Sequence, residues 1–201
     1  MLITTDAIVL SLQPLSDKAH LLHAYTRECG RVNYKVYGIG RKHAIGLYMP
    51  LSVLRITASH PLAGFPTVRE TAPAAETPAL SSLTTDPYKR AIALFISEVM
   101  YHVLRHPMPD APMFDFLVGA VRDLEALSAT DEPEGRIANF HLKFLIDFAC
   151  KLGFAMVEDP VMPQTREERQ KTLRALCAYF SVHVETWQTP RSLEILMEVF
   201  D

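Results

Sequence analysis

Five short segments of strand-like composition fill the first 72 residues and constrain the fold more than any other feature of this 201-residue chain. They are rich in Ile, Val, Leu, Tyr and Thr, their apolar residues recur with a spacing close to two, and Pro, Gly or Asp bounds them. That spacing excludes a helical interpretation. Such a series is typical of a small Greek-key barrel, and we predict strands at residues 5–12, 20–26, 31–39, 51–57 and 67–71.

Turn-forming and helix-capping residues mark the boundaries of the predicted elements. The four residues from Arg27 to Gly30 predict a tight hairpin in which Gly30 takes a positive φ. Residues 71–85 are rich in Ala, Pro, Ser and Thr and predict a linker. Asp86 and Pro87 then suit the cap and the first residue of a helix that Pro107 ends. We therefore expect an α+β chain, with a barrel domain over 1–80 and a helical domain over 81–201.

The second part has a helical period. In its first helix the apolar residues follow a spacing of three and four, and later helices are predicted at residues 114–128, 136–152, 166–184 and 190–200. The segment 136–152 is apolar on most sides, which indicates a central helix, and Gly153 suits the position after its end. The apolar face of the first helix consists of Ile92, Phe95, Ile96, Val99, Met100 and Val103.

Charge is distributed unevenly. The net charge is −3, which alone argues against nucleic-acid binding, but residues 1–80 carry eight Lys/Arg against five Asp/Glu and the remainder is acidic. No apolar run approaches the roughly 20 residues that span a bilayer, and the start lacks a basic signal region. The three cysteines form no CxxC pair, which favours reduced thiols. We expect a cytoplasmic protein without a membrane partner.

Cations gather around the third predicted strand. Arg31 and Lys35 alternate on one face and Tyr37 continues it, a combination that single-strand stacking platforms use. Arg41 and Lys42 follow in a loop where they would neutralise phosphates without sequence preference. These five residues are our candidate nucleic-acid contacts. For stacking by Tyr37, as for Tyr34, we favour the alternative of a solvated strand face with the tyrosine half in the core.

The sequence gives little support for a phosphate loop, a metal site or a catalytic site. Gly38 and Gly40 are not followed by the Lys-Ser/Thr of a phosphate loop. His102 and His106 have metal-ligand spacing on a predicted helix but lack a third ligand, so we expect no metal. No catalytic constellation is present, and we expect a protein that is not an enzyme and needs no cofactor.

The ordered combination of these features resembles the RecO family. The resemblance implies an OB-fold barrel that binds single- and double-stranded DNA, anneals strands and helps load RecA onto strands coated with single-stranded-DNA-binding protein (SSB), with RecR as partner and a place at the nucleoid. An OB-fold accessory module for RNA or tRNA, and an interaction protein with a non-binding barrel, remain alternatives. The resemblance rests on residues 8–10, 14–17, 21–26, 29–31 and 38–42, and on Glu98, 114–124 and 140–154.

The resemblance also implies features of the helical domain. Many family members carry a four-cysteine zinc site after the Leu152-Gly153-Phe154 motif, but here only residues 155–165 precede the final helices and no such site is expected. The family docks the acidic, Phe-terminated SSB tail on this domain. A cation beside an apolar side chain suits that tail. On segment 136–152 the candidates are Arg136, Phe140, Lys143 and Phe144, and the alternative is a core helix with solvated charges.

Overall fold

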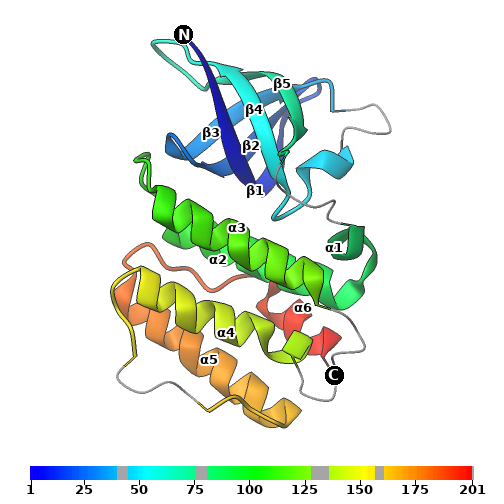
Figure 1. The fold of residues 1–201 in the computed structure, drawn as a ribbon, viewed down its shortest axis with the longest axis vertical. Coiled ribbons are helices and arrows are strands. Elements are labelled where there is room, and N and C mark those ends of the chain that lie inside the picture. Colours follow the sequence, from blue (N-terminus) through cyan, green and yellow to red (C-terminus); the bar gives the residue numbers. More distant parts are fainter. Residues whose placement is uncertain (40–44, 76–80, 128–135, 157–160, 201) are drawn as a thin grey trace. The chain divides into compact units, whose positions relative to one another are not determined.

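The computed structural model describes residues 1–39, 45–75, 81–127, 136–156 and 161–200 (Figure 1). The chain divides into two compact units, each described separately below. The first comprises Met1–Leu80 and Leu104–Arg122, and the second comprises Ser81–Val103 and Asp123–Asp201. The barrel unit thus includes a stretch from the second half of the sequence, whereas the boundary near residue 80 stays a prediction.

A closed five-stranded barrel forms the first unit, which confirms the predicted fold class. Its strand order is β1-β2-β3-β5-β4, and all neighbours are antiparallel except β3 and β5. β1 is longer than the sequence predicted because its first half pairs with β4 and its second half with β2. The elements are β1 (Leu2–Ser16), β2 (Ala19–Thr26), β3 (Gly30–Tyr37), the short 3-10 helix η1 (Ile45–Tyr48), β4 (Val53–Ser59) and β5 (Thr67–Pro73).

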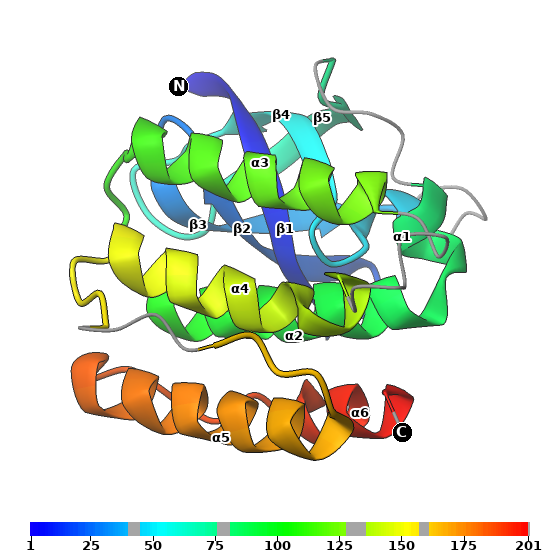
Figure 2. The same cartoon turned by 60° about the horizontal axis from the view of Figure 1, so that its bottom comes forward.

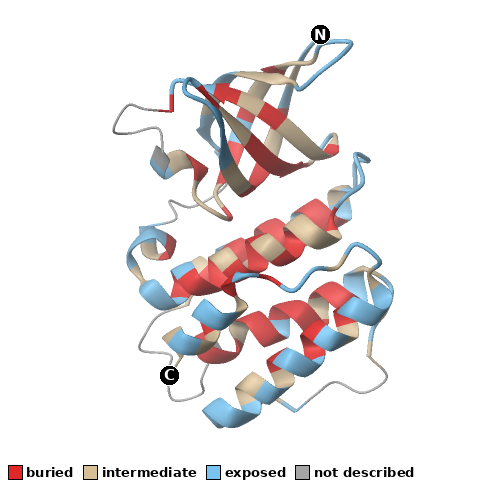
Figure 3. Ribbon diagram, turned by 180° about the vertical axis from the view of Figure 1, so that it is seen from behind, coloured by how far each residue is buried: buried red, intermediate tan, exposed pale blue. Residues whose placement is uncertain are grey.

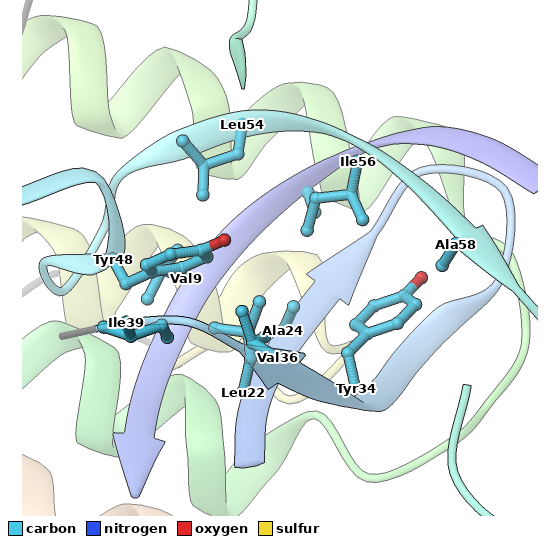
Figure 4. Packing of buried hydrophobic residues seen from close by; sticks show 11 residues of the cluster. Val9, Leu22, Ala24, Tyr34, Val36, Ile39, Tyr48, Leu54, Ile56 and Ala58 are labelled. Carbon is cyan, nitrogen blue, oxygen red and sulfur yellow. The ribbon is translucent and has the colours of Figure 1, made fainter. Parts of the chain in front are cut away.

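Alternate residues of β1, β2, β3 and β4 fill the barrel (Figure 4). Leu22 and Ala24 come from β2 and Tyr34 and Val36 from β3, and all four are at most 3% exposed. This period of two is what the strand pattern predicted. Burial raises the pKa of the Tyr34 phenol, and its ring meets His60 edge-on, with 6.0 Å between centroids.

The hairpin between β2 and β3 packs against the stretch Leu104–Arg122 of its own unit. Gly30 has φ +64°, as predicted, and a Cβ added there would lie 2.2 Å from the Met108 carbonyl oxygen. The Arg31 N–H donates to the His106 carbonyl oxygen at 3.1 Å. Arg27 forms an ion pair with Asp115 and lies over the Phe114 ring, 5.7 Å from its centroid. Glycine at position 30 is therefore required by close approach as well as by conformation.

The second unit is helical. α4 lies between α2 and α5, and α6 packs on α2 (Figure 2), which confirms the central position predicted for α4. Buried residues concentrate in α2 and α4 (Figure 3). Its helices are α1 (Ser81–Thr85), α2 (Pro87–Val103), α4 (Arg136–Lys151), α5 (Arg166–His183) and α6 (Ser192–Val199); α3 (Ala111–Ala126) begins in the barrel unit.

Side chains cap these helices. The Asp86 carboxylate accepts from the backbone N–H groups of Tyr88 at 2.8 Å and Lys89 at 3.2 Å, which confirms the predicted N-cap of α2. Gly153, at φ +89°, follows the end of α4 as predicted. The Glu98 carboxylate accepts from both the backbone N–H and the hydroxyl of Ser192 and so caps α6 from α2.

Two predictions are wrong in detail. The linker predicted over 71–85 contains α1, because the Glu125 carboxylate accepts from the backbone N–H groups of Ser82 and Leu83 at 2.8 and 2.9 Å. Burial opposes ionisation of Glu125, but these hydrogen bonds outweigh it and lower its pKa. α2 ends at Val103, four residues before Pro107, because the proline has no N–H to donate to the Val103 carbonyl oxygen and its ring clashes with that carbonyl. His102 and His106 therefore do not share a helix.

Candidate nucleic-acid interface

The outward face of β3 carries the cations that the sequence singled out. Because Tyr34 and Val36 point into the barrel, Arg31, Lys35 and Tyr37 point away from it. Tyr37 is 58% exposed, so it lies outside the core, whereas Tyr34 lies in it. The structure thus places the three predicted residues in one row along the strand.

The Arg31 end of this row is covered by the Leu104–Arg122 stretch of the barrel unit, and we call it the covered end. Arg31 lies where the Leu104–Arg122 stretch crosses the hairpin, is half-buried, and has its Nε atom shielded from solvent. Nearby, Nδ1 of His23 is 2.7 Å from Oδ1 of Asn33. Burial lowers the pKa of His23, the hydrogen bond that its Nδ1–H donates to Asn33 opposes this, and the charges of Arg31 and Arg105 lower it further. This end is a packed polar junction, and the role of Arg31 as a DNA contact stays a prediction.

The other end is accessible and continues onto β5. Lys35 pairs with Thr67, and its backbone N–H donates to the Pro66 carbonyl oxygen at 2.7 Å. Two residues further along these parallel strands lie Tyr37 and Arg69, both exposed. We call Lys35, Tyr37, Arg69 and the preceding loop residue Phe65, which is 43% exposed, the β3–β5 face.

Sequence reasoning missed Arg69. It lies at a bulge in β5, because the β4 register runs from Ala58 opposite Val68 to Thr57 opposite Glu70 and passes over Arg69. Its place on the β3–β5 face follows from the parallel pairing of β3 with β5, which no local pattern indicates. Arg69 is one of the eight Lys/Arg residues within 1–80, but the sequence pattern did not assign it to the predicted nucleic-acid contacts.

The described cations of the barrel unit differ in their partners. Arg55 forms a two-pronged ion pair with Asp6, at 2.8 and 3.0 Å, and Arg27 is held by Asp115. Lys35 and Arg69 make no ion pair with another described residue. The β3–β5 face therefore offers positive charge beside exposed aromatic rings. Arg41 and Lys42 lie outside the described residues, and their role stays a prediction.

The described predicted tail-binding residues lie in different surroundings. Phe144 is buried and stacks on Phe148, with 5.3 Å between ring centroids, and Phe140 is half-buried. Lys143 is exposed and pairs with Asp147 at 2.7 Å. Arg136 is the first residue of α4, but its side chain is not among those described. The role of these residues in binding a partner stays a prediction.

Three further findings concern the described part of the chain. It contains no cluster of three or more His, Cys, Asp or Glu residues that could hold a metal ion. No described helix has the length and apolar character to cross a membrane. The cysteines are unpaired: Cys29 is half-buried, Cys150 is exposed, and burial raises the pKa of Cys177 to about 11.

The strand order and the parallel closure of β3 on β5 define an OB-fold barrel accompanied by helices. Residues 1–74 match the family described as "Recombination protein O N terminal". The DNA repair protein RecO of Phocaeicola vulgatus is 32% identical over 174 residues, which cover 85% of this chain and 66% of that protein. The protein of the same name from Porphyromonas gingivalis strain W83 is 33% identical over 160 residues, 76% of this chain and 61% of the relative. The chain belongs to the RecO family.

The chain is shorter than its relatives. It spans slightly less than two thirds of the length of these first two proteins. The DNA repair protein RecO of Christiangramia forsetii aligns over the whole of both chains at 25% identity, but across 247 positions against 201 residues here. That relative therefore has residues without a counterpart in this chain.

Proposed function

We propose that this protein is a recombination mediator that binds DNA through its barrel. The observation that carries the proposal is the β3–β5 face, where the exposed residues Tyr37 and Arg69 each lie two residues beyond the paired Lys35 and Thr67 of an OB-fold barrel. The relatives named DNA repair protein RecO supply the biological setting. The proposed role is non-enzymatic, comprising binding of single and double strands, annealing, and help in loading RecA.

The β3–β5 face suits a single strand. Cations beside it would neutralise phosphates and release counterions, and this interaction depends on salt but not on sequence. An aromatic ring accepts any base by stacking, which contributes about 1–3 kcal/mol per base. The β3–β5 face carries both cations and exposed aromatic rings, so a DNA strand laid over it would contact both.

Partner binding belongs to the same proposal. RecR and the SSB tail are the proposed partners, and the tail would dock on the helical unit. Lys143 and Arg136 remain the proposed contacts for its terminal carboxylate. Lys143 would then break its solvent-exposed ion pair with Asp147 and form one with the carboxylate of the tail. Breaking the first pair would cost little free energy, because surface ion pairs contribute little to stability.

Fluorescence anisotropy with a labelled single strand tests the proposal, with unlabelled single strand, duplex and RNA as competitors. We expect both DNA forms to compete and binding to weaken as salt rises. RNA as the strongest competitor would favour the accessory-module alternative. Stimulated annealing, and RecA loading on SSB-coated strands with RecR, test the mediator role separately.

The loop after β3 gives a sharper test. Reversing both Arg41 and Lys42 to glutamate should weaken single-strand binding with little sequence dependence. Loss of two phosphate contacts should lower the log–log salt slope by about 1.4. Lys171→Glu, on the exposed side of α5, is the control and should leave the slope unchanged. Unchanged affinity and slope in a folded double variant would reject the loop as a contact.

A further inference from the structure

The turn between β4 and β5 is apolar and exposed. Every residue from 61 to 65 is exposed and none of them is charged. Leu62 has the highest exposed fraction of the large hydrophobic residues that the structure describes, and Phe65 is also exposed. Runs of exposed apolar residues are avoided on a protein surface unless they make a contact, so this run indicates one. We call residues 61–65 the apolar loop.

The start of β1 adds apolar surface at the same end of the barrel (Figure 1). Leu2 pairs with Ser59, the last residue of β4, and is 65% exposed. Met1 is exposed as well, and its carbonyl oxygen accepts from the His60 N–H at 2.8 Å. The apolar loop is therefore part of a larger exposed apolar patch and not an isolated side chain.

The base of the apolar loop is held on both sides. On entry, His60 is bonded to the start of β1, and its ring meets the buried Tyr34 ring edge-on, with 6.0 Å between centroids. On exit, the Pro66 carbonyl oxygen accepts from the Lys35 N–H at 2.7 Å, and Thr67 pairs with Lys35. A tip on a fixed base loses little conformational entropy when it enters a ligand.

The exit of the apolar loop leads onto the β3–β5 face, and Phe65 belongs to both. That face carries Lys35 and Arg69, which suit phosphates, whereas an uncharged apolar tip would only desolvate a phosphate. The tip suits the apolar faces of bases instead. A purely apolar protein surface would match the loop but not the neighbouring cations, whereas DNA matches both.

We propose that the apolar loop inserts Leu62 between neighbouring bases of a DNA duplex, so that the protein favours duplexes that are already opened locally at a mismatch. Apolar side chains act as wedges between base steps, and unstacking costs least where pairing is already lost. This inference rests on the proposed binding of DNA by the barrel and adds a preference to it.

Anisotropy titrations of the full chain test the preference. The labelled probes have one length and comprise a paired duplex, the same duplex with a central mismatch, and the single strand. We expect the mismatched duplex to bind about tenfold more tightly than the paired one, because the wedge then needs less unstacking. Equal affinities for the two duplexes would overturn this inference and leave the proposed function intact. Binding of no probe would reject DNA binding by the barrel, and this inference with it.

Substitutions locate the wedge. Leu62→Ala should remove most of the mismatch preference and leave the salt slope unchanged, because an apolar contact releases no counterions. Val182→Ala is the matched control, since Val182 is 80% exposed but lies on α5, and the preference should persist. Leu62→Met keeps an apolar wedge and should retain the preference as well. Thermal melts check that the variants fold, and an equal loss of preference in the two alanine variants would overturn the inference.

A fluorescent base reports unstacking directly. Aminopurine placed beside the mismatch brightens when its stacking is lost. At saturating protein, the unsubstituted chain should brighten it more than Leu62→Ala does, and equal brightness would overturn the inference. Sedimentation covers the competing occupant, a second copy of the chain. A dimer that Leu62→Ala dissociates, with the mismatch preference unchanged, would assign the apolar loop to contact between copies and overturn the inference.

Discussion

Arg31 and Lys35 point outward from the same face of one strand, four residues apart, yet they meet different surroundings. At Arg31 the strand is crossed by the Leu104–Arg122 stretch, whose His106 carbonyl oxygen accepts from the strand's own N–H. At Lys35 the outward side continues onto β5 and the exposed rings of the β3–β5 face. Period-two alternation thus predicts which face of the strand a side chain lies on. Packing against distant parts of the chain decides whether that part of the face is open to a ligand.

The largest expected effect tests the covered end. Gly30→Ala would place a Cβ 2.2 Å from the Met108 carbonyl oxygen in a residue with φ +64°. Overpacking and backbone strain together should lower the free energy of unfolding by about 3 kcal/mol or more. Chemical denaturation measures it.

Gly64→Ala is the matched control for that substitution. Gly64 also has a positive φ, +87°, but a Cβ there would meet nothing within 4 Å. It should cost only about 1 kcal/mol, from backbone strain alone. Equal losses in the two variants would show that the stretch does not press on the hairpin as described.

A double charge reversal tests the Lys35 end of the row, which we call the open end. Charge reversal of both Lys35 and Arg69 to glutamate should weaken single-strand binding about a hundredfold at low salt, with a salt slope lowered by about 1.4. Arg31→Ala should leave that slope unchanged and act instead on stability, because Arg31 lies in the covered junction. A slope lowered as much by Arg31→Ala would remove the distinction between the two ends.

The comparison also shows what local patterns can reveal. The Arg27–Gly30 hairpin, the Asp86 cap and the α4 core were predictable because turn chemistry, capping and periodicity are local. The role of residues 104–122 in the barrel unit was not predictable, and neither was the place of Arg69 on the β3–β5 face, since both depend on contacts between distant parts of the chain. The same limit applies to Phe144. Its apolar side chain suited a docking pocket as well as the core, and the structure places it in the core.

A smaller effect separates the aromatic component of the open end from its charge. Tyr37→Ala should weaken single-strand binding about tenfold through the loss of one stacked base, with the salt slope unchanged. Tyr37→Phe keeps the ring and should bind as the unsubstituted protein does. Anisotropy at two salt concentrations distinguishes the cases, and a changed slope in the alanine variant would mean that Tyr37 acts by organising the neighbouring cations.

The smallest effect concerns the ion pair that fastens the covered end. Hydrogen bonding to Arg27 is the main cause that lowers the pKa of Asp115 in the folded protein, and both side chains are solvent-exposed. A carboxyl with a lowered folded pKa contributes stability that is present above its unfolded pKa and disappears as pH falls through the folded value. Asp115→Asn should therefore unfold at a slightly lower temperature than the unsubstituted protein at pH 7, and the two melting temperatures should converge once the pH falls below the lowered pKa of Asp115. Asp147→Asn, which removes the exposed partner of Lys143 within the helical unit, is the control for a surface pair of similar exposure. Thermal melts across this pH range decide the matter, because a difference that persists in acid would assign the stabilisation to packing of Arg27 on the Phe114 ring and not to the charge of Asp115.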